Sequence, residues 1–141
     1  CGIIDNKAYK NSYSITGNHK RVMEDVYIPD IHKYVDTKYP IAFFAYVAES
    51  FGKNIDNQVR EIGYHTGING AAMPVDILIN IAHDYAEKGY DHTFIKRVFS
   101  VNREVRLSDL GQKAHNIVTY ESNETSTLSY VAENTVPYGE S

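Results

Sequence analysis

Short apolar runs alternate with segments of helical periodicity along the first hundred residues of the chain. The clearest run, 41–48, holds eight consecutive apolar residues after Pro40, which is typical of a strand covered on both faces. Shorter runs at 2–6 and 69–74 predict two further strands. Strands that alternate with helices indicate an α/β layer fold with a parallel or mixed sheet.

The segment 19–38 has the weakest helical pattern. We expect an interruption at Pro29, because the residue before a proline resists the helical region of backbone space. The positions expected on the buried face of this helix are Val26, Ile31, Tyr34 and Val35.

Three other segments carry clearer helix signals. The segment 54–66 has regular apolar spacing and ends before Gly67, which is typical of a helix stop. Pro74 opens a second helix, and Gly89 lies just past its end. Asp91 is placed to cap a last helix that carries four apolar residues.

Composition limits the class of protein. A length of 141 residues suffices for one domain with a buried core and is too short for two. The single cysteine, Cys1, excludes an internal disulfide and a cysteine-rich zinc site, which fits a reducing cytosol. The longest apolar run is too short to span a membrane, and no signal peptide is visible. Because the chain begins without Met inside a strand-like run, we expect a fragment of a longer protein.

The net charge of −4 is unevenly distributed. Residues 118–141 contain four glutamates and no Lys or Arg, whereas residues 1–23 hold four basic side chains against Asp5 alone. A basic cluster beside a polar motif indicates an anionic partner, although a solvated basic loop would have the same composition. The polar segment 107–141 is interpreted as a C-terminal extension, either a marginal hairpin (118–122 with 128–132) or a mobile tail.

The candidate chemistry lies at the end of the first predicted strand, in the stretch Asp5-Asn6-Lys7. Side chains two residues apart on a strand share a face, so the carboxylate and the ammonium are expected side by side. Such a pair suits Mg²⁺-dependent phosphodiester hydrolysis, with the backbone carbonyl of Asn6 as a further ligand. The chain supplies no clear second carboxylate, and a surface ion pair at a strand end is the alternative. About one acid-x-Lys match is expected by chance, and the second match, at Asp36, lies at a predicted helix end.

The stretch "GIIDNKAYKNSY" resembles the catalytic strand of the FokI-type restriction endonuclease cleavage domain, a branch of the PD-(D/E)xK nuclease superfamily. The longer stretch "FFAYVAESFGKNIDNQVREIGYHTGINGAAMPVDILINI" is similar to the later strands and helices of that family. The resemblance covers about residues 2–106, with a loop insertion around 14–28, so 1–106 is expected to be the nuclease domain. It implies a three-layer core with a mixed central sheet flanked by helices, here without its first helix and first strand.

The resemblance also implies a site. Asp5 matches the family's second metal-binding acid, Lys7 matches its catalytic lysine, and Asp5 and Asn6 would bind Mg²⁺ or Mn²⁺. The family's first acid belongs to the preceding strand, which is not found in this sequence. The residues expected to contact the DNA backbone are Tyr9, Lys10, Lys20 and Arg21.

Partners follow from the same resemblance. Double-stranded DNA would be the substrate, two cleavage domains would pair transiently, and a separate domain would recognise the DNA sequence. The stretch "PDIHKYV" is the best match to the pairing helix, which makes Asp30 and Lys33 candidates for a dimer face. A bacterial, cytoplasmic protein without membrane contact is expected.

Two alternatives from other classes remain open. Without the first acid, the domain would be a degenerate nuclease fold that binds DNA or dimerises without cleaving. The opening "CGII" also looks like the start of an N-terminal-nucleophile amidohydrolase, in which Cys1 would be the nucleophile. That class of enzyme has a double β-sheet sandwich, whereas only three strands are predicted here.

Overall fold

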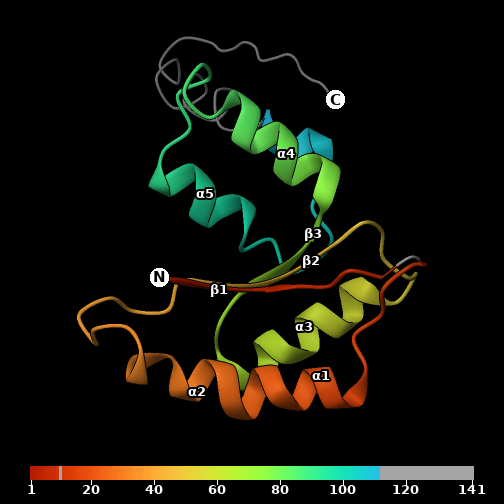
Figure 1. Ribbon diagram of the computed structural model, residues 1–141, viewed down its shortest axis with the longest axis vertical. Helices are drawn as coiled ribbons and strands as arrows, with labels where there is room; N and C mark the ends of the chain where they lie inside the picture. The colour runs from red at the N-terminus through yellow and green to blue at the C-terminus, as the bar shows by residue number, and fades with distance from the viewer. Residues whose placement is uncertain (10, 112–141) are drawn as a thin grey trace, which may run out of the picture. The chain divides into compact units, whose positions relative to one another are not determined.

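A parallel three-stranded sheet organises residues 1–105 (Figure 1). The computed structural model describes residues 1–9 and 11–111, and its strands are β1 (Gly2–Asn6), β2 (Phe43–Ala48) and β3 (Gly70–Pro74), in that spatial order. All three predicted strands are therefore confirmed. The expectation of a mixed sheet is not, because both strand pairs are parallel and each is joined by a helical crossover.

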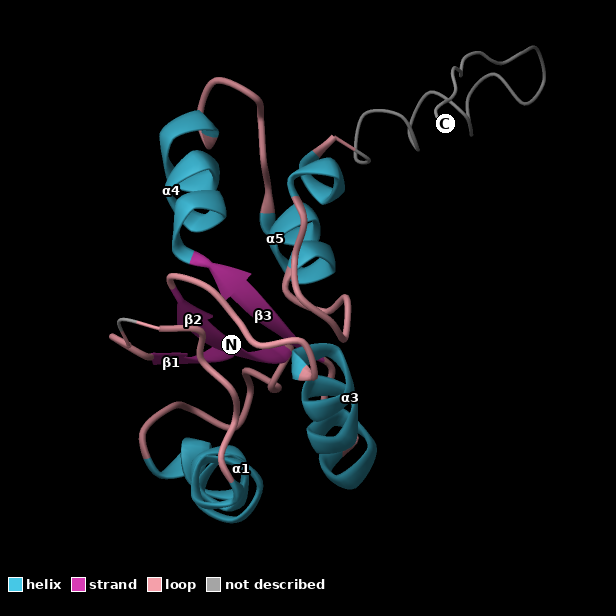
Figure 2. Cartoon of the chain, turned by 90° about the vertical axis from the view of Figure 1, so that its right-hand side faces the viewer, coloured by secondary structure: helices cyan, strands magenta, loops and turns pink. Residues whose placement is uncertain are grey.

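Helices cover both faces of this sheet and complete three layers (Figures 1 and 2). On one face lie α1 (Gly17–Val22), α2 (Ile28–Asp30) and α3 (Ile55–Thr66). On the other face lie α4 (Val75–Asp84) and α5 (His92–Val98). Among the described residues, no helix has the length and apolar character needed to cross a bilayer.

Strand β2 is buried along its whole length, as its unbroken apolar run predicts. Phe44 and Tyr46 point into the core cluster with α1 and α3, which includes Met23 and Val59. Phe43 points the opposite way and stacks on Phe99, at 4.8 Å between ring centroids. The alternation of side chains along one strand thus supplies both hydrophobic layers.

The first helical segment differs from its predicted form. It runs from Gly17 through Pro29 to Lys33, with a π-helical turn at Met23–Tyr27 and a 3₁₀ turn at Ile31–Lys33. The predicted interruption at Pro29 is therefore wrong, because this proline falls in the first turn of α2, just after the hydrogen-bond register changes.

The π-helical turn also changes which side chains are buried. Met23 and Ile28 enter the core, whereas Val26 and Tyr34, which we expected there, are 40% and 84% exposed. The Ile28 N–H donates to the carbonyl of Met23, five residues earlier, so the buried face advances by five positions where an α-helix would advance by three or four.

Two other helix boundaries follow their sequence signals, and a third does not. Gly67 ends α3 in the left-handed region at φ 73°, and the Asp91 side chain caps α5 by accepting the Phe94 N–H at 2.8 Å. Gly89 also adopts a positive φ, but α4 ends at Asp84, so the predicted helix end beside Gly89 is wrong.

Residues 106–141 form a second unit. Its described part is a 3₁₀ turn, Leu107–Leu110, in which Asp109 accepts the Arg106 N–H at 2.7 Å. The predicted hairpin or tail at 118–132 lies outside the described residues, and the expected domain limits at 106 and 107 stay a prediction.

Two glycines allow aromatic rings to lie flat across the sheet. Gly2 pairs with Phe43 and Gly70 pairs with Phe44, and a Cβ on either glycine would overlap the ring of its partner. Phe44 is fully buried between β2 and the α1–α3 layer, so its ring has no space into which it can move. Glycine at position 70 is therefore a packing requirement of the sheet.

We expect Gly70→Ala to lower the free energy of unfolding by roughly 1–3 kcal/mol, because the added methyl group overpacks the core against Phe44. Gly17→Ala is the matched control: a Cβ there meets open space at the start of α1, so it should be neutral or stabilise by up to about 1 kcal/mol. Urea unfolding followed by circular dichroism measures both. Equal effects of the two substitutions would contradict the packing argument.

Candidate functional site

Asp5 and Lys7 lie side by side at the carboxyl end of β1. The Lys7 Nζ is 2.9 Å from Asp5 Oδ2, and the two side chains are only 15% and 17% exposed. Asp5 pairs in register with Tyr46 on the neighbouring strand, so both charged groups lie on the sheet face that α1 and α3 cover. A half-buried pair of this kind is more rigidly held than an ion pair on the open surface.

Two buried tyrosines lie beneath this pair. The Tyr13 hydroxyl is 2.8 Å from His19 Nδ1, and the Tyr46 hydroxyl donates to the His19 carbonyl at 3.2 Å. Burial raises the pKa of both phenols above the usual 10.0, and the nearby Asp5 carboxylate raises each further. Both phenols are therefore neutral at physiological pH and form a polar but uncharged floor below Asp5.

The carbonyl of Asn6 points away from β2. Lys7 N–H donates to the Val47 carbonyl at 2.7 Å, and residues that face a parallel neighbour alternate along the strand, so Asn6 faces the open edge of the sheet. Its carbonyl and the Asp5 carboxylate therefore both offer oxygen atoms that can bind a metal ion at the end of one edge strand.

A pocket of about 330 Å³ opens at this end of the sheet. It is lined by Asn6, Lys7, Ala8, Tyr9, Glu49 and Val75. Glu49, which directly follows β2, is not among the residues predicted from the sequence. The sequence does contain a signal for Glu49. Parallel strands end on the same side of a sheet, so an acidic residue directly after a buried parallel strand lies near the end of the neighbouring strand.

The donors present suit a hard divalent cation in kind, since Mg²⁺ prefers carboxylate and carbonyl oxygens. They fall short in number. Across residues 1–9 and 11–111, no three His, Cys, Asp or Glu side chains come together in a way that could hold a metal ion. Asp5 and Asn6 can therefore supply part of a magnesium site and need a further carboxylate to complete it.

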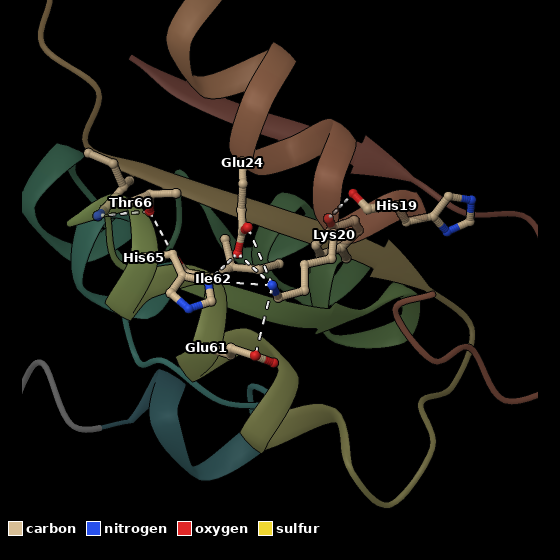
Figure 3. Close-up of polar contacts among 9 residues, drawn as sticks. His19, Lys20, Glu24, Glu61, Ile62, His65 and Thr66 are labelled. Carbon is tan, nitrogen blue, oxygen red and sulfur yellow. Dashed lines mark hydrogen bonds and ion pairs between the residues drawn. The ribbon is translucent and has the colours of Figure 1, made fainter. Parts of the chain in front are cut away.

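Lys20, expected at the DNA backbone, lies in a network of side chains between α1 and α3 (Figure 3). Its Nζ is 3.2 Å from Glu24 Oε2 and 3.8 Å from Glu61 Oε2, and Glu24 also contacts His65 Nδ1 at 2.9 Å. Two carboxylates thus surround this ammonium, and the network links the two helices that cover the site.

The other expected backbone contacts differ in placement. Arg21 is exposed and donates to Asn18 Oδ1 at 2.6 Å. Tyr9 is 46% exposed and stacks on Tyr13, with ring centroids 5.1 Å apart. Lys10 lies outside the described residues.

Asp30 and Lys33 form an exposed ion pair at 3.4 Å on the far end of the same helical segment. Beside them is an apolar groove of about 220 Å³, which lies next to the edge strand β1. The groove is lined by Ile3, Val26, Tyr27, Asp30, Ile31 and Tyr34. The candidate dimer-face residues therefore adjoin exposed apolar side chains.

Cys1 is exposed, its amine donates to the Pro40 carbonyl at 2.7 Å, and its Sγ lies 3.5 Å from the Tyr39 carbonyl. Residues 1–105 form one sheet between two helical layers, so they lack the double β-sheet sandwich of N-terminal-nucleophile amidohydrolases. The amidohydrolase alternative is wrong on this ground.

Comparison with known proteins gives one family. A family model described as the FokI cleavage domain matches residues 1–106. The structure of restriction endonuclease FokI is similar at 21% identity and a TM-score of 0.63, over 75% of this chain and 21% of that chain. The structure of FokI bound to DNA gives 22% identity and a TM-score of 0.62, over 75% of this chain and 20% of that chain. The chain thus spans about a fifth of these solved structures, and no curated protein matches it.

We expect the fold to lose stability as the pH rises above 10. The folded-state pKa of Tyr13 and Tyr46 is raised, so their contribution is complete below the unfolded value of 10.0 and is lost above it. The loss should reach about 1.4 kcal/mol per pH unit for each phenol. Urea unfolding at pH 9, 10 and 11 measures this slope, and a Tyr13→Phe/Tyr46→Phe double variant should flatten it. An unchanged slope in the double variant would contradict the assignment.

Proposed function

Since the chain belongs to the FokI cleavage-domain family, we propose that it is the cleavage domain of a type IIS-like restriction endonuclease. In this proposal it hydrolyses phosphodiester bonds of double-stranded DNA with the help of Mg²⁺ or Mn²⁺. The observation that carries the proposal is the Asp5–Lys7 pair, 2.9 Å apart and half-buried at the end of an edge strand.

Each residue of the pair has a separate task. Asp5, together with the Asn6 carbonyl, would hold the metal ion. The ion, when bound, would polarise the scissile phosphate and lower the pKa of a bound water molecule. The Lys7 ammonium, held beside Asp5, would orient the attacking water and stabilise the negative charge that develops on the phosphate oxygens.

The missing carboxylate would come from a strand that pairs with the open edge of β1. Among the described residues β1 has only β2 as a neighbour, and its Ile4 is 52% exposed on one face. On the other face Ile3 contributes to the apolar groove. A strand added at this edge would cover both side chains, and an acid on it would lie near the Asn6 carbonyl.

DNA would approach across the carboxyl ends of the strands. Arg21 is exposed, and Tyr9 borders the pocket with a residue exposure of 46%, so both could contact phosphates, as could Lys10. Lys20 would contribute only by exchanging its carboxylate partners for a phosphate, so its main task would be to hold α1 against α3.

Two cleavage domains would pair through the face that carries Asp30, Lys33 and the adjoining groove. Sequence recognition would belong to a separate domain.

A non-catalytic DNA-binding module is the second candidate. The observation that favours it is that, among the described residues, no three His, Cys, Asp or Glu side chains come together in a way that could hold a metal ion. This candidate predicts salt-sensitive DNA binding without any metal-dependent strand scission.

Asp5→Asn and Lys7→Met should each lower plasmid cleavage by the full protein on the order of 10³-fold, because they remove a metal ligand and the group that stabilises the developing charge. DNA binding, measured by fluorescence anisotropy, should remain. The matched control is Asp36→Asn in the second Asp-x-Lys stretch, where the exposed carboxylate accepts the Lys38 N–H at 3.0 Å. Cleavage by Asp5→Asn at the wild-type rate would refute the site, and wild-type protein that binds DNA but never nicks it with Mg²⁺ would favour the non-catalytic module.

Charge reversal tests the dimer face. Asp30→Lys and Lys33→Asp should each slow cleavage at low protein concentration, because each leaves like charges on this face. A mixture of the two variants should recover part of the rate. Lys88→Asp, in the comparable pair with Asp84 at 3.8 Å, is the control and should change nothing. If the mixture is no faster than either variant alone, this face does not mediate pairing.

A further inference from the structure

We propose that Tyr13 is a positioning residue that holds the Lys7 ammonium in place beside Asp5. This inference rests on the proposed function, because Lys7 is the residue whose position matters for cleavage. It goes beyond that function by assigning a role to a loop tyrosine in the segment between β1 and α1.

The ring of Tyr13 and the carboxylate of Asp5 together restrict Lys7. The Lys7 Nζ is 6.0 Å from the Tyr13 ring centroid and 2.9 Å from Asp5 Oδ2. Attraction between an ammonium and an aromatic face extends to about 6 Å and strengthens where water is excluded. Lysine has a long and flexible stem, so an ion pair alone leaves it several rotamers. A second, apolar support reduces this freedom.

The Tyr13 ring is itself fixed. It is 2% exposed, and its centroid lies 5.1 Å from that of Tyr9, 5.9 Å from that of Tyr46 and 6.2 Å from that of Phe51. A ring packed against three others cannot swing away from Lys7 without disturbing the core.

The backbone of this loop is fastened to the segment that follows β2. Tyr13 N–H donates to the Ser50 carbonyl at 2.9 Å, and Gly52 N–H donates to the Tyr13 carbonyl at 3.0 Å. The Gln58 side chain of α3 bonds both the N–H and the carbonyl of Ile15, at 3.0 and 3.2 Å. The support under Lys7 is therefore part of the rigid sheet framework, although it belongs to a loop.

His19 sets the orientation of the phenol. Its Nδ1 is 2.8 Å from the Tyr13 hydroxyl, and it lies in the first turn of α1, where its backbone carbonyl also accepts the Tyr46 hydroxyl. A continuous chain of contacts therefore leads from α1 through His19 and Tyr13 to Lys7. Loss of either partner of the Tyr13–His19 bond should loosen the ring by the same amount.

The simpler alternative is that Tyr13 only fills the core. Both roles predict that a large truncation destabilises the fold, so stability does not separate them. They differ at Lys7: a positioning residue changes the environment of this ammonium and the turnover rate, whereas a core-filling residue changes neither once the protein is folded.

The first test is NMR of the 141-residue chain with ¹³C,¹⁵N-labelled lysine, in which Lys7→Met assigns the Lys7 signals. The ring current of Tyr13 should move the Lys7 ε-methylene protons upfield. Tyr13→Leu should abolish that displacement, and Tyr13→Phe should keep most of it. Tyr90→Leu is the matched control, because it removes a buried ring, stacked on Phe94 at 3.9 Å, from the opposite face of the sheet. An upfield Lys7 signal that is absent in the wild type, or unaffected by Tyr13→Leu, would overturn the inference.

The second test is cleavage by the full protein. Tyr13→Leu should lower kcat about tenfold with KM unchanged, since a misplaced catalytic group affects turnover more than binding. Tyr13→Phe and His19→Leu should cause equal and smaller losses, and their combination should be no worse than either, because both break one hydrogen bond. These two milder variants keep the test decisive if Tyr13→Leu fails to fold.

The two proposals fail in different ways. A wild-type protein that shows the displaced Lys7 signal but cleaves no DNA overturns the proposed function while supporting the placement of Lys7 by Tyr13. A protein that cleaves normally after Tyr13→Leu, with a Lys7 signal as displaced as in the wild type, overturns the positioning role while the proposed function stands.

Discussion

The burial of β2 on both faces is the constraint on which the rest of the structure depends. Its six residues are almost inaccessible to water, so the strand needs a strand on each side and a helical layer above and below. Parallel neighbours supply the first requirement. The crossover helices supply the layer on one face, and α4 and α5, which follow β3, supply the layer on the other. Aromatic residues fill both layers, and Gly2 and Gly70 leave the space that these rings occupy.

The polar side chains of the candidate site lie where this buried sheet ends. The edge strand β1 has a neighbouring strand on one side only among the described residues, so its last residue, Asn6, is exposed while Ile3 remains part of the core. Asp5 and Lys7 are therefore half-buried on a rigid base, which suits groups that must stay in position during a reaction. Tyr13 and Tyr46, which lie below this pair, add no negative charge to the site, because burial keeps both phenols neutral.

The helical segment that follows the site departs most from its sequence pattern. A π-helical turn moves Met23 and Ile28 into the core and leaves Val26 and Tyr34 exposed beside the Asp30–Lys33 pair. Its hydrogen bonds reach five residues back, so the 3.6-residue period that identifies a buried face does not apply. The environment of Lys20 likewise could not be predicted from a local sequence pattern. The packing of the first helical segment against α3 brings the carboxylates of Glu24 and Glu61 together at its ammonium.

Sequence by itself determined the three strands, most helix boundaries, the Asp5–Lys7 pair and the family, because each depends on local periodicity, on caps or on a continuous run of similar residues. Only the tertiary structure decided the parallel direction of the strands, the burial of Tyr13 under Lys7, the bond from Tyr13 to His19 and the arrival of Glu49 at the same pocket. These features join residues whose approach depends on how the helices cross the sheet. Local sequence patterns do not encode that packing. They therefore identify the chemical groups of the site but not the residues that hold these groups in position.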